Sequence, residues 1–592
     1  MEIAFQGDSR LKTRIIYDGQ CPFCTRYTTL VRLKNSVGPV ELVDVRLQPE
    51  LLQELQREGF DLDLGMVFEH QGQRYGGAEA VHRIALLSSS VGWFSQLTAR
   101  MFGSSALTRI AYPLLRAGRG AVLLALGRDR IHPDTVADRS LFAMFAHVWG
   151  LFSFLHLMYY IFYDGLSNVI PSVWAIGALG VALALRPQSA RLFVALLIAT
   201  LVGAWMQMPV HSNHTAVRNF TLLALASAAA YNWLRGRSWA AFVRSFAPAG
   251  RAILLIMYVF GVFHKINTDF LDPSVSCAVA LWQMMPQPLP WLDALWFKWL
   301  AIYGTLIIEA LIIVGLLSRR GRHWAIVSGI AFHTMLALSG YGYYPSFSAL
   351  TIALHFLYLS PEGAARVLGA PSWQRLQEAL HSPRGLSLAG IWLAFLWLLT
   401  LNGNASLVGL ALLPWSVWLI ALVYTHGRVR NGERMSGPPV ISRTWGINLV
   451  TVFFFFSSFA PYLGLKNAQS INMFANLVYE GGRSNHLLMT GPPGPFQYLN
   501  DLVRPFDSQG DSYLRYVEKN DLLVTYYDLL NRLDRKPEAS VSYERDGQIY
   551  RAQSARTLQA EIEQKLHPRW FRNWFVFRPV DLRQPKECSI SQ

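Results

Sequence analysis

Uninterrupted apolar segments recur between residues 141 and 465, and they constrain the fold of this chain more than any other feature. Of its 592 residues, 52% are hydrophobic and only 15% are charged, which is too little charge for a soluble protein of this length. Such segments predict membrane helices, because a helix satisfies its own backbone hydrogen bonds. We expect about eleven spans, at residues 141–163, 172–185, 192–208, 219–234, 252–266, 292–317, 324–338, 347–359, 386–401, 406–425 and 446–464.

The net charge of +15 is distributed in step with these segments. Every second loop is basic, whereas the loops at 164–171, 339–346 and 402–405 contain no Lys or Arg. This alternation follows the positive-inside rule and argues against nucleic acid as a partner. It predicts a multi-pass protein of the inner (plasma) membrane, in contact with the lipid bilayer, with a cytoplasmic N-terminus and an extracytoplasmic C-terminus. The polar beginning of the chain predicts that there is no signal peptide.

Polar regions flank the apolar region, so we expect five parts in sequence. They are a first domain at 1–92, a basic amphipathic linker at 93–135, a membrane domain at 136–360, further spans at 361–465 and an extracytoplasmic tail at 466–592. The linker mixes apolar residues with arginines at helical spacing, which predicts a helix on the cytoplasmic leaflet. Its basic residues are Arg100, Arg109, Arg116, Arg119, Arg128 and Arg130. The tail has strand-like runs at 522–527 and 539–543, which predict a small α/β or β domain.

Two cysteines separated by two residues mark the first domain, in the sequence Cys21-Pro22-Phe23-Cys24. A strand-like run at 14–17 and an Asp18-Gly19 turn precede them, and a helix-compatible stretch at 25–33 follows. A helix N-terminus favours a thiolate, and two sulfurs at this spacing can close into a disulfide. We therefore predict a redox dithiol, with Cys21 as the more exposed, attacking thiol and Cys24 as the resolving thiol.

Half of a zinc site is the alternative interpretation of these two cysteines. The chain has only two others, Cys277 and Cys588, which are far away and lack the CxxC spacing. We therefore predict no metal site. The expected topology places Cys277 and Cys588 on the same oxidising side of the membrane, where a disulfide between them can form.

The segment Tyr17-Asp18-Gly19-Gln20-Cys21-Pro22-Phe23-Cys24 resembles the YDGxCPxC signature of the DCC thiol-disulfide oxidoreductase family, also called DUF393. The resemblance implies an α/β thioredoxin-like domain and disulfide exchange, with a protein thiol as a candidate substrate. The expected elements agree with it: a strand at 40–45, a helix at 49–58, a hairpin at 65–69 and 73–75, and a closing helix at 78–87. No proline precedes the strand at 65–67, so the cis-proline that faces the dithiol in thioredoxins is missing.

Ionisable side chains inside apolar segments are costly, which makes them candidate functional residues. Six stand out, namely His214, His264, Lys265, Glu309, His333 and His355. The expected direction of the spans brings four of them, His214, His264, Lys265 and His333, toward the outer half of the membrane. A lysine there can act as a base, and histidines can transfer protons near neutral pH. For each histidine, the alternative to a functional role is a role in packing, and for His355 packing is the favoured one. For Lys265, the alternative is that a lysine near the end of a span extends its ammonium to the lipid headgroups.

A second resemblance starts from Gly261-Val262-Phe263-His264-Lys265-Ile266-Asn267-Thr268-Asp269-Phe270, which is similar to a membrane segment of vitamin K-dependent γ-carboxylases and their bacterial HTTM-domain relatives. Lys265 corresponds to the proposed catalytic base of that family. Asn213-His214-Thr215 and Phe332-His333-Thr334-Met335 resemble two further segments of it. With this resemblance, Lys265 and His214 become candidate catalytic residues. His264, Glu309 and His333 become candidate ligands of a quinone, similar to vitamin K, as the cofactor.

Three functions follow from these patterns. The first, which we favour, is an integral-membrane thiol-disulfide oxidoreductase whose dithiol is coupled to a quinone-like substrate in the helical bundle. The second is a carboxylase-like enzyme to which the dithiol domain is merely fused. The third is a transporter or assembly factor, which the lack of an inverted repeat disfavours. A cytoplasmic dithiol and an outer-half polar cluster would lie at opposite faces, so coupling would require a diffusing carrier or a relay.

Overall fold

The computed structural model describes most of the chain, in sixteen segments. These are residues 13–30, 39–62, 65–87, 93–126, 131, 136–165, 169–209, 212–235, 239–284, 290–339, 341–342, 344–402, 405–428, 439–492, 494–583 and 585–588. The chain divides into two units, Met1–Val136 with Ser227–Val243, and Ala137–Ala226 with Arg244–Gln592. Arg128 and Arg130 of the predicted linker, and residues 31–33 of the predicted first helix, lie outside the described residues.

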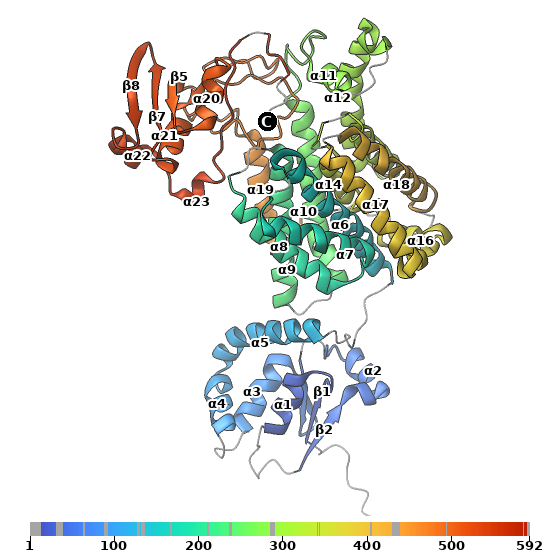
Figure 1. Ribbon diagram of the computed structural model, residues 1–592. Helices are drawn as coiled ribbons and strands as arrows, with labels where there is room; N and C mark the ends of the chain where they lie inside the picture. The colour runs from blue at the N-terminus through green and yellow to red at the C-terminus, as the bar shows by residue number, and fades with distance from the viewer. Residues whose placement is uncertain are drawn as a thin grey trace, which may run out of the picture. The chain divides into compact units, whose positions relative to one another are not determined.

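The first unit contains a four-stranded sheet with the strand order β2-β1-β3-β4. β1 and β2 are labelled in Figure 1. Its strands are β1 (Thr13–Tyr17), β2 (Val40–Asp44), β3 (Val67–His70) and β4 (Gln73–Gly76). β1 pairs parallel to β2 and antiparallel to β3, and β3 and β4 form the predicted hairpin. Successive side chains of a strand point to opposite faces. Ile15 therefore packs with the two cysteines, while Ile16 packs with Leu55 on the other face.

Helices complete this small α/β domain, as predicted. They are α1 (Pro22–Leu30), the 3-10 helix η3 (Val45–Leu47), α2 (Pro49–Arg57), α3 (Gly77–Leu87), α4 (Trp93–Phe102) and α5 (Ser105–Leu126). α1 begins three residues earlier than predicted, because the fixed φ of Pro22 suits the first helical position. Phe102 of α4 and Tyr112 of α5 pack against Val81 and Ala85 of α3. The segment expected as a linker thus contributes to the core of the domain.

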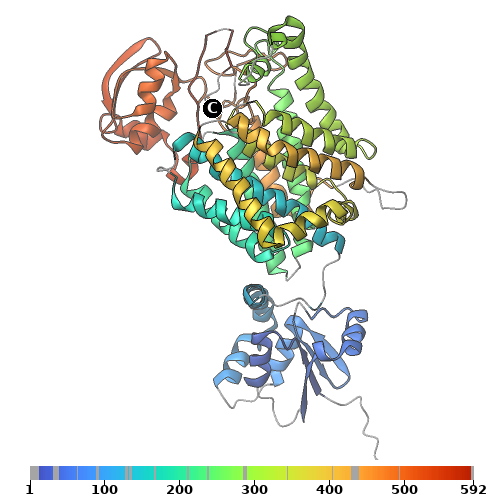
Figure 2. The same ribbon diagram turned by 45° about the vertical axis from the view of Figure 1, so that its right-hand side comes forward.

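The second unit is mostly helical (Figures 1 and 2). Its helices are α6 (Val136–Asp164), α7 (Pro171–Leu185), α8 (Ala190–Met206), α9 (Asn213–Leu234), α10 (Trp239–Phe263), α11 (Cys277–Gln283), α12 (Leu295–Leu317), α13 (Arg322–Leu336), α14 (Tyr344–Phe356), α15 (Pro361–Leu368), α16 (Pro371–His381), α17 (Pro383–Leu401), α18 (Ala405–His426) and α19 (Trp445–Phe459). The C-terminal end of α9 and the N-terminal end of α10, within Ser227–Val243, belong to the first unit.

Five helices of the described chain are long and apolar enough to cross a membrane, so the eleven predicted spans are not supported. The five segments are Arg139–Ile161, Ala241–Phe263, Leu295–Leu317, Pro383–Leu401 and Ser406–His426, and α7, α8 and α19 are shorter apolar helices. Helix length is one reason for the difference. α14 has 13 residues, all of them buried, and such a helix is about 20 Å long, against about 30 Å for a hydrocarbon core. Its apolar residues serve packing within the protein.

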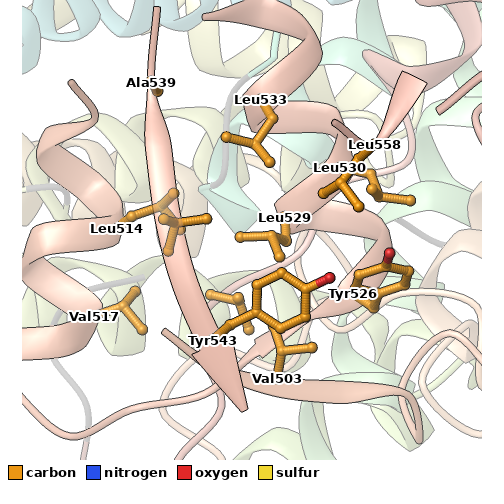
Figure 3. Close-up of a cluster of buried hydrophobic side chains, with 12 residues drawn as sticks. Val503, Leu514, Val517, Tyr526, Leu529, Leu530, Leu533, Ala539, Tyr543 and Leu558 are labelled. Atoms are coloured by element: carbon orange, nitrogen blue, oxygen red, sulfur yellow. The ribbon is translucent and has the colours of Figure 1, made fainter. Parts of the chain in front are cut away.

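The tail forms a second α/β domain with an antiparallel sheet in the order β6-β5-β7-β8. The strands are β5 (Leu502–Gln509), β6 (Val524–Thr525), β7 (Ser540–Arg545) and β8 (Gln548–Ser554), and the helices are α20 (Ser512–Lys519), α21 (Tyr526–Arg535), α22 (Gln559–Lys565) and α23 (Arg569–Arg572). Figure 3 shows its core, in which Leu514, Leu529 and Tyr543 are buried.

Of the two strand-like runs predicted in the tail, 539–543 largely coincides with β7. The run at 522–527 is a strand only at Val524 and Thr525. Thr525 then caps α21 by accepting a hydrogen bond from the backbone N–H of Asp528, so the chain turns helical at Tyr526.

Candidate functional site

The dithiol lies at the N-terminal end of α1, with both cysteines as free thiols. Cys21 precedes the helix and acts as its cap, because its Sγ accepts a hydrogen bond from the backbone N–H of Cys24 at 3.3 Å. Cys21 is 0% exposed and Cys24 is 6% exposed. The prediction that Cys21 is the more exposed thiol was therefore wrong, and the physical reason is that α5 contributes side chains that cover it.

Arg119 of α5 connects the dithiol to a buried acid. Its Nε donates to Sγ of Cys21 at 3.1 Å, and its Nη2 donates to Oδ2 of Asp18 at 3.1 Å. Arg46 donates from Nε to the other oxygen of Asp18 at 2.6 Å. Asp18 is 3% exposed, and these two arginines compensate the cost of burying its charge.

The turn before the dithiol explains two residues of the signature. Asp18 accepts the backbone N–H of Gln20 at 3.1 Å, and Asp44 of β2 accepts the backbone N–H of Gly19 at 3.0 Å. A Cβ atom on Gly19 would lie 1.9 Å from Oδ2 of Asp44. Only glycine lets the Asp44 carboxylate approach the turn this closely.

The two thiols differ in acidity. The hydrogen bond from the Cys24 thiol and the charge of Arg119 outweigh burial and lower the pKa of Cys21 to about 6. The same thiol–thiol hydrogen bond, together with burial, raises the pKa of Cys24. The lower pKa makes Cys21 the thiol of the pair that ionises first. The assignment of Cys21 as the attacking thiol and Cys24 as the resolving thiol stays a prediction.

Tyr112 of α5 occupies the space next to Gly65, which lies two residues before the start of β3. A Cβ atom on Gly65 would lie 1.9 Å from the Tyr112 hydroxyl oxygen. No peptide bond is cis among the described residues of this domain, and no proline directly precedes β3 in the sequence. Burial raises the pKa of Tyr112 to about 12, which keeps it neutral beside the dithiol.

In the second unit, Lys265 and Glu309 form a buried ion pair. The Lys265 ammonium donates to Oε1 and Oε2 of Glu309 at 2.7 and 2.6 Å. Lys265 follows the end of α10, and Glu309 lies in the middle of α12. Both residues line a cavity of about 100 Å³, together with Phe270, Trp282, Phe332, His333 and Phe474. The cavity is thus aromatic, with a charged pair in its wall.

His333 joins this cavity to a chain of hydrogen bonds. Its Nε2 lies 2.9 Å from the hydroxyl of Tyr258, which also lies 3.3 Å from Nε2 of His355. His355 donates from Nδ1 to the carbonyl of Thr351 at 2.8 Å. His333 is 2% exposed, and its Nδ1 has no hydrogen-bond partner among the described residues. A buried polar atom of this kind at a cavity wall can bond a water molecule or a polar group of a ligand.

The other two predicted residues lie elsewhere. The ring nitrogens of His264 contact the Tyr462 hydroxyl at 2.8 Å and the Ser470 carbonyl at 2.9 Å. His214 contacts Ser212, and its ring packs against His156 and Tyr159. Neither histidine is among the residues that line the Lys265 cavity.

A segment from the C-terminal part of the chain forms one wall of the cavity, through Ile471, Met473 and Phe474. Asn213, beside His214, accepts the backbone N–H of Ile471 at 2.8 Å. Ile471 and Phe474 have φ angles of 59° and 51°. Such left-handed conformations cost energy in β-branched and bulky residues, and they cluster at functional sites.

The loop after Lys265 is fixed by the same C-terminal part. Asn485 donates from Nδ2 to Oδ2 of Asp269 at 2.9 Å, and the backbone N–H of Lys586 donates to the same oxygen at 3.0 Å. Cys277 and Cys588, 311 residues apart, form a disulfide with a Cα–Cα distance of 4.8 Å. These contacts tie the end of the chain to the loop that carries Lys265.

Sequence reasoning placed Arg119 in the linker and missed its contact with Cys21. It also missed Tyr258, which links His333 to His355, and the wall at residues 471–474. In a helix with several arginines, the sequence does not show which arginine is buried. A cavity wall formed by a segment distant in the chain leaves no pattern in the residues near Lys265.

Residues 15–124 match the family model described as DCC1-like thiol-disulfide oxidoreductase. The match includes the dithiol and continues through α5, the helix that supplies Arg119 and Tyr112. The chain therefore carries a thiol-disulfide oxidoreductase domain at its N-terminus, followed by a mostly helical body. No curated protein and no solved structure matches the chain. The resemblance to vitamin K-dependent carboxylases is not supported by any of these comparisons.

Proposed function

We propose that this protein is a membrane-anchored thiol-disulfide oxidoreductase in which Cys21 attacks and Cys24 resolves. The observation that carries the proposal is the contact of Cys21 Sγ with Arg119 and with the Cys24 backbone, which stabilises one thiolate of the pair. The Cys21 thiolate attacks one sulfur of a substrate disulfide, and the other sulfur leaves as a thiolate. Cys24 loses its proton and attacks Sγ of Cys21, which releases the second substrate thiol and leaves a Cys21–Cys24 disulfide.

Trapping of the mixed disulfide tests this order. Cys24→Ser should accumulate a covalent adduct at Cys21 that a reductant releases, because the resolving thiol is gone. Cys21→Ser is the matched control and should form no adduct. Adducts at Cys24 in the Cys21→Ser protein, with none at Cys21 in the Cys24→Ser protein, would reverse the assignment.

We propose that the helical body anchors the domain in the inner (plasma) membrane, with the dithiol in the cytoplasm and the tail outside. The free thiols of Cys21 and Cys24 suit a reducing compartment, and the Cys277–Cys588 disulfide suits an oxidising one. α5 also exposes an apolar stripe, at Leu107, Ile110 and Leu114, next to Arg109. This stripe supports contact of α5 with the surface of an anionic bilayer.

We also propose the Lys265 cavity as the site of a quinone-like lipid. When bound, a quinone supplies an acceptor for the two electrons and two protons that a dithiol releases on forming a disulfide. The aromatic lining suits a planar ring. An ammonium has three N–H donors, of which Glu309 takes two, so one is left for a ligand oxygen. Because Lys265 is already engaged by Glu309, we propose a binding role for it rather than the role of a base.

A further inference from the structure

We propose that Arg119 is a positioning residue of the redox site, which holds the Cys21 sulfur as a thiolate and fixes its direction. Arg119 lies 98 residues after Cys21 in the sequence. The inference rests on the proposed function and extends it, because it makes α5 part of the active site.

The charges around Cys21 support this role. Arg119 and Arg46 contribute two positive charges beside Asp18, which contributes one negative charge. The Asp44 carboxylate lies across the turn, where its Oδ1 accepts the backbone N–H groups of Gly19 and Arg46 at 3.0 Å each. Two carboxylates thus lie near the two arginines, and Arg119 is the arginine that contacts the Cys21 sulfur, at 3.1 Å. A positive charge at this distance favours the thiolate over the thiol.

Guanidinium geometry explains why an arginine serves here. One edge of the Arg119 side chain donates through Nε to Cys21 and through Nη2 to Asp18. Asp18 is itself held by Arg46 and by the turn, so the fork fixes the sulfur relative to the sheet. A lysine carries the same charge but presents a flexible point donor, which cannot hold both groups in one plane.

The other described groups around Cys21 do not supply this charge. Met66, Phe68, Ala80 and Ile84 are apolar side chains of the same cluster. Cys24 donates a hydrogen bond from its thiol, and burial keeps Tyr112 neutral. Removing Arg119 should therefore weaken the thiolate even though the dithiol and its helix remain.

Alkylation of Cys21 as a function of pH tests the role in the full-length reduced protein. Iodoacetamide is the probe, and mass spectrometry of the peptide that contains Cys21 gives the rate. Each curve is normalised to its own plateau at high pH, so slow access to the buried thiol does not move the midpoint. We expect a wild-type midpoint at pH about 6.

Arg119→Met should raise this midpoint by about 1–2 pH units, because the charge of Arg119 is lost while the hydrogen bond from Cys24 remains. Alkylation at pH 7 should slow about twofold or more. The alkylation midpoint of Arg119→Lys should lie between those of the wild type and Arg119→Met. Arg109→Met, an exposed arginine on the same helix, is the matched control and should leave the midpoint unchanged.

A wild-type midpoint in Arg119→Met overturns the inference. If that variant does not fold, Arg119→Gln, which also removes the charge, decides in its place, and a wild-type midpoint there has the same meaning. Loss of turnover in Cys21→Ser tests the proposed function separately. If Cys21→Ser loses turnover but the alkylation midpoint does not change in the Arg119 variants, the proposed function stands. Only the positioning role of Arg119 is then wrong.

Discussion

The Lys265 ammonium lies 2.7 and 2.6 Å from the two carboxylate oxygens of Glu309, and both side chains are nearly buried in the wall of one aromatic cavity. A buried pair of this kind adds little net stability, but removal of one partner leaves an uncompensated charge. Packing alone does not explain this pair, and we propose that it binds a polar group of a ligand.

Lys265→Met should destabilise the protein by about 3–5 kcal/mol, because Glu309 then remains buried without its partner. The double variant Lys265→Met/Glu309→Leu should recover most of this loss, since no unpaired charge remains. Both should lack bound quinone in solvent extracts of the purified protein. Thermal unfolding and quinone quantification separate the two effects. Wild-type quinone content in the double variant would show that the ion pair does not bind it.

The stability of the reduced protein should depend on pH through Cys21. Its folded pKa of about 6 lies below the ordinary value, so the stabilisation is fully present above the pKa of the unfolded thiol, about 8.5. It should decline as the pH falls toward about 6 and be lost below that value. The difference in melting temperature between the wild type and Cys21→Ser should thus be larger at pH 9 than at pH 5. A melting-temperature difference between the wild type and Cys21→Ser that increases toward low pH would contradict a lowered pKa for Cys21.

Gly19→Ala should disrupt the turn that holds the dithiol. The new Cβ would lie 1.9 Å from Oδ2 of Asp44, and relief of this clash would cost about 1–3 kcal/mol and displace Asp44 from the turn. We expect slower disulfide exchange as well as a lower melting temperature. Gly118→Ala on α5 is the matched control, because a Cβ there meets nothing within 4 Å. Equal effects of the two substitutions would argue against the tight turn.

Cys588→Ser should release the end of the chain from the loop that carries Lys265. The disulfide closes a loop of 311 residues, and its removal should cost about 2–4 kcal/mol. Cys277 should then react with a membrane-impermeant maleimide added from outside the cell, whereas neither cysteine should react in the wild type. Labelling of Cys277 only after the membrane is opened would place this loop on the cytoplasmic side and contradict the proposed topology.

The sequence was sufficient for the sheet and the dithiol of the first domain, because strand alternation, the Asp18-Gly19 turn and the CxxC spacing are local signals. It was not sufficient for the number of spans. Apolar composition does not distinguish a helix that faces lipid from α14, whose residues are buried in protein. Arg119 was read as one more basic residue of a linker, since its burial beside Cys21 depends on how α5 packs.

In the second unit, Lys265 and Glu309 were each identified as costly in an apolar segment, but their pairing was not. His264 is expected near Lys265 because the predicted direction of the spans brings both toward the outer half of the membrane. The chain turns after α10, however, and His264 instead contacts Tyr462 and Ser470. Neighbouring residues in a turn point in different directions, so sequence proximity alone could not decide which side chain enters the cavity.

The most direct test of the redox assignment is competition between the two thiols in the reduced wild-type protein. A limiting amount of iodoacetamide at pH 7 should modify Cys21 first and leave Cys24 largely unmodified, because only Cys21 is then mostly thiolate. Peptide mass spectrometry resolves the two positions. Preferential modification of Cys21 is the predicted result, and equal, slow modification of both cysteines would contradict the account.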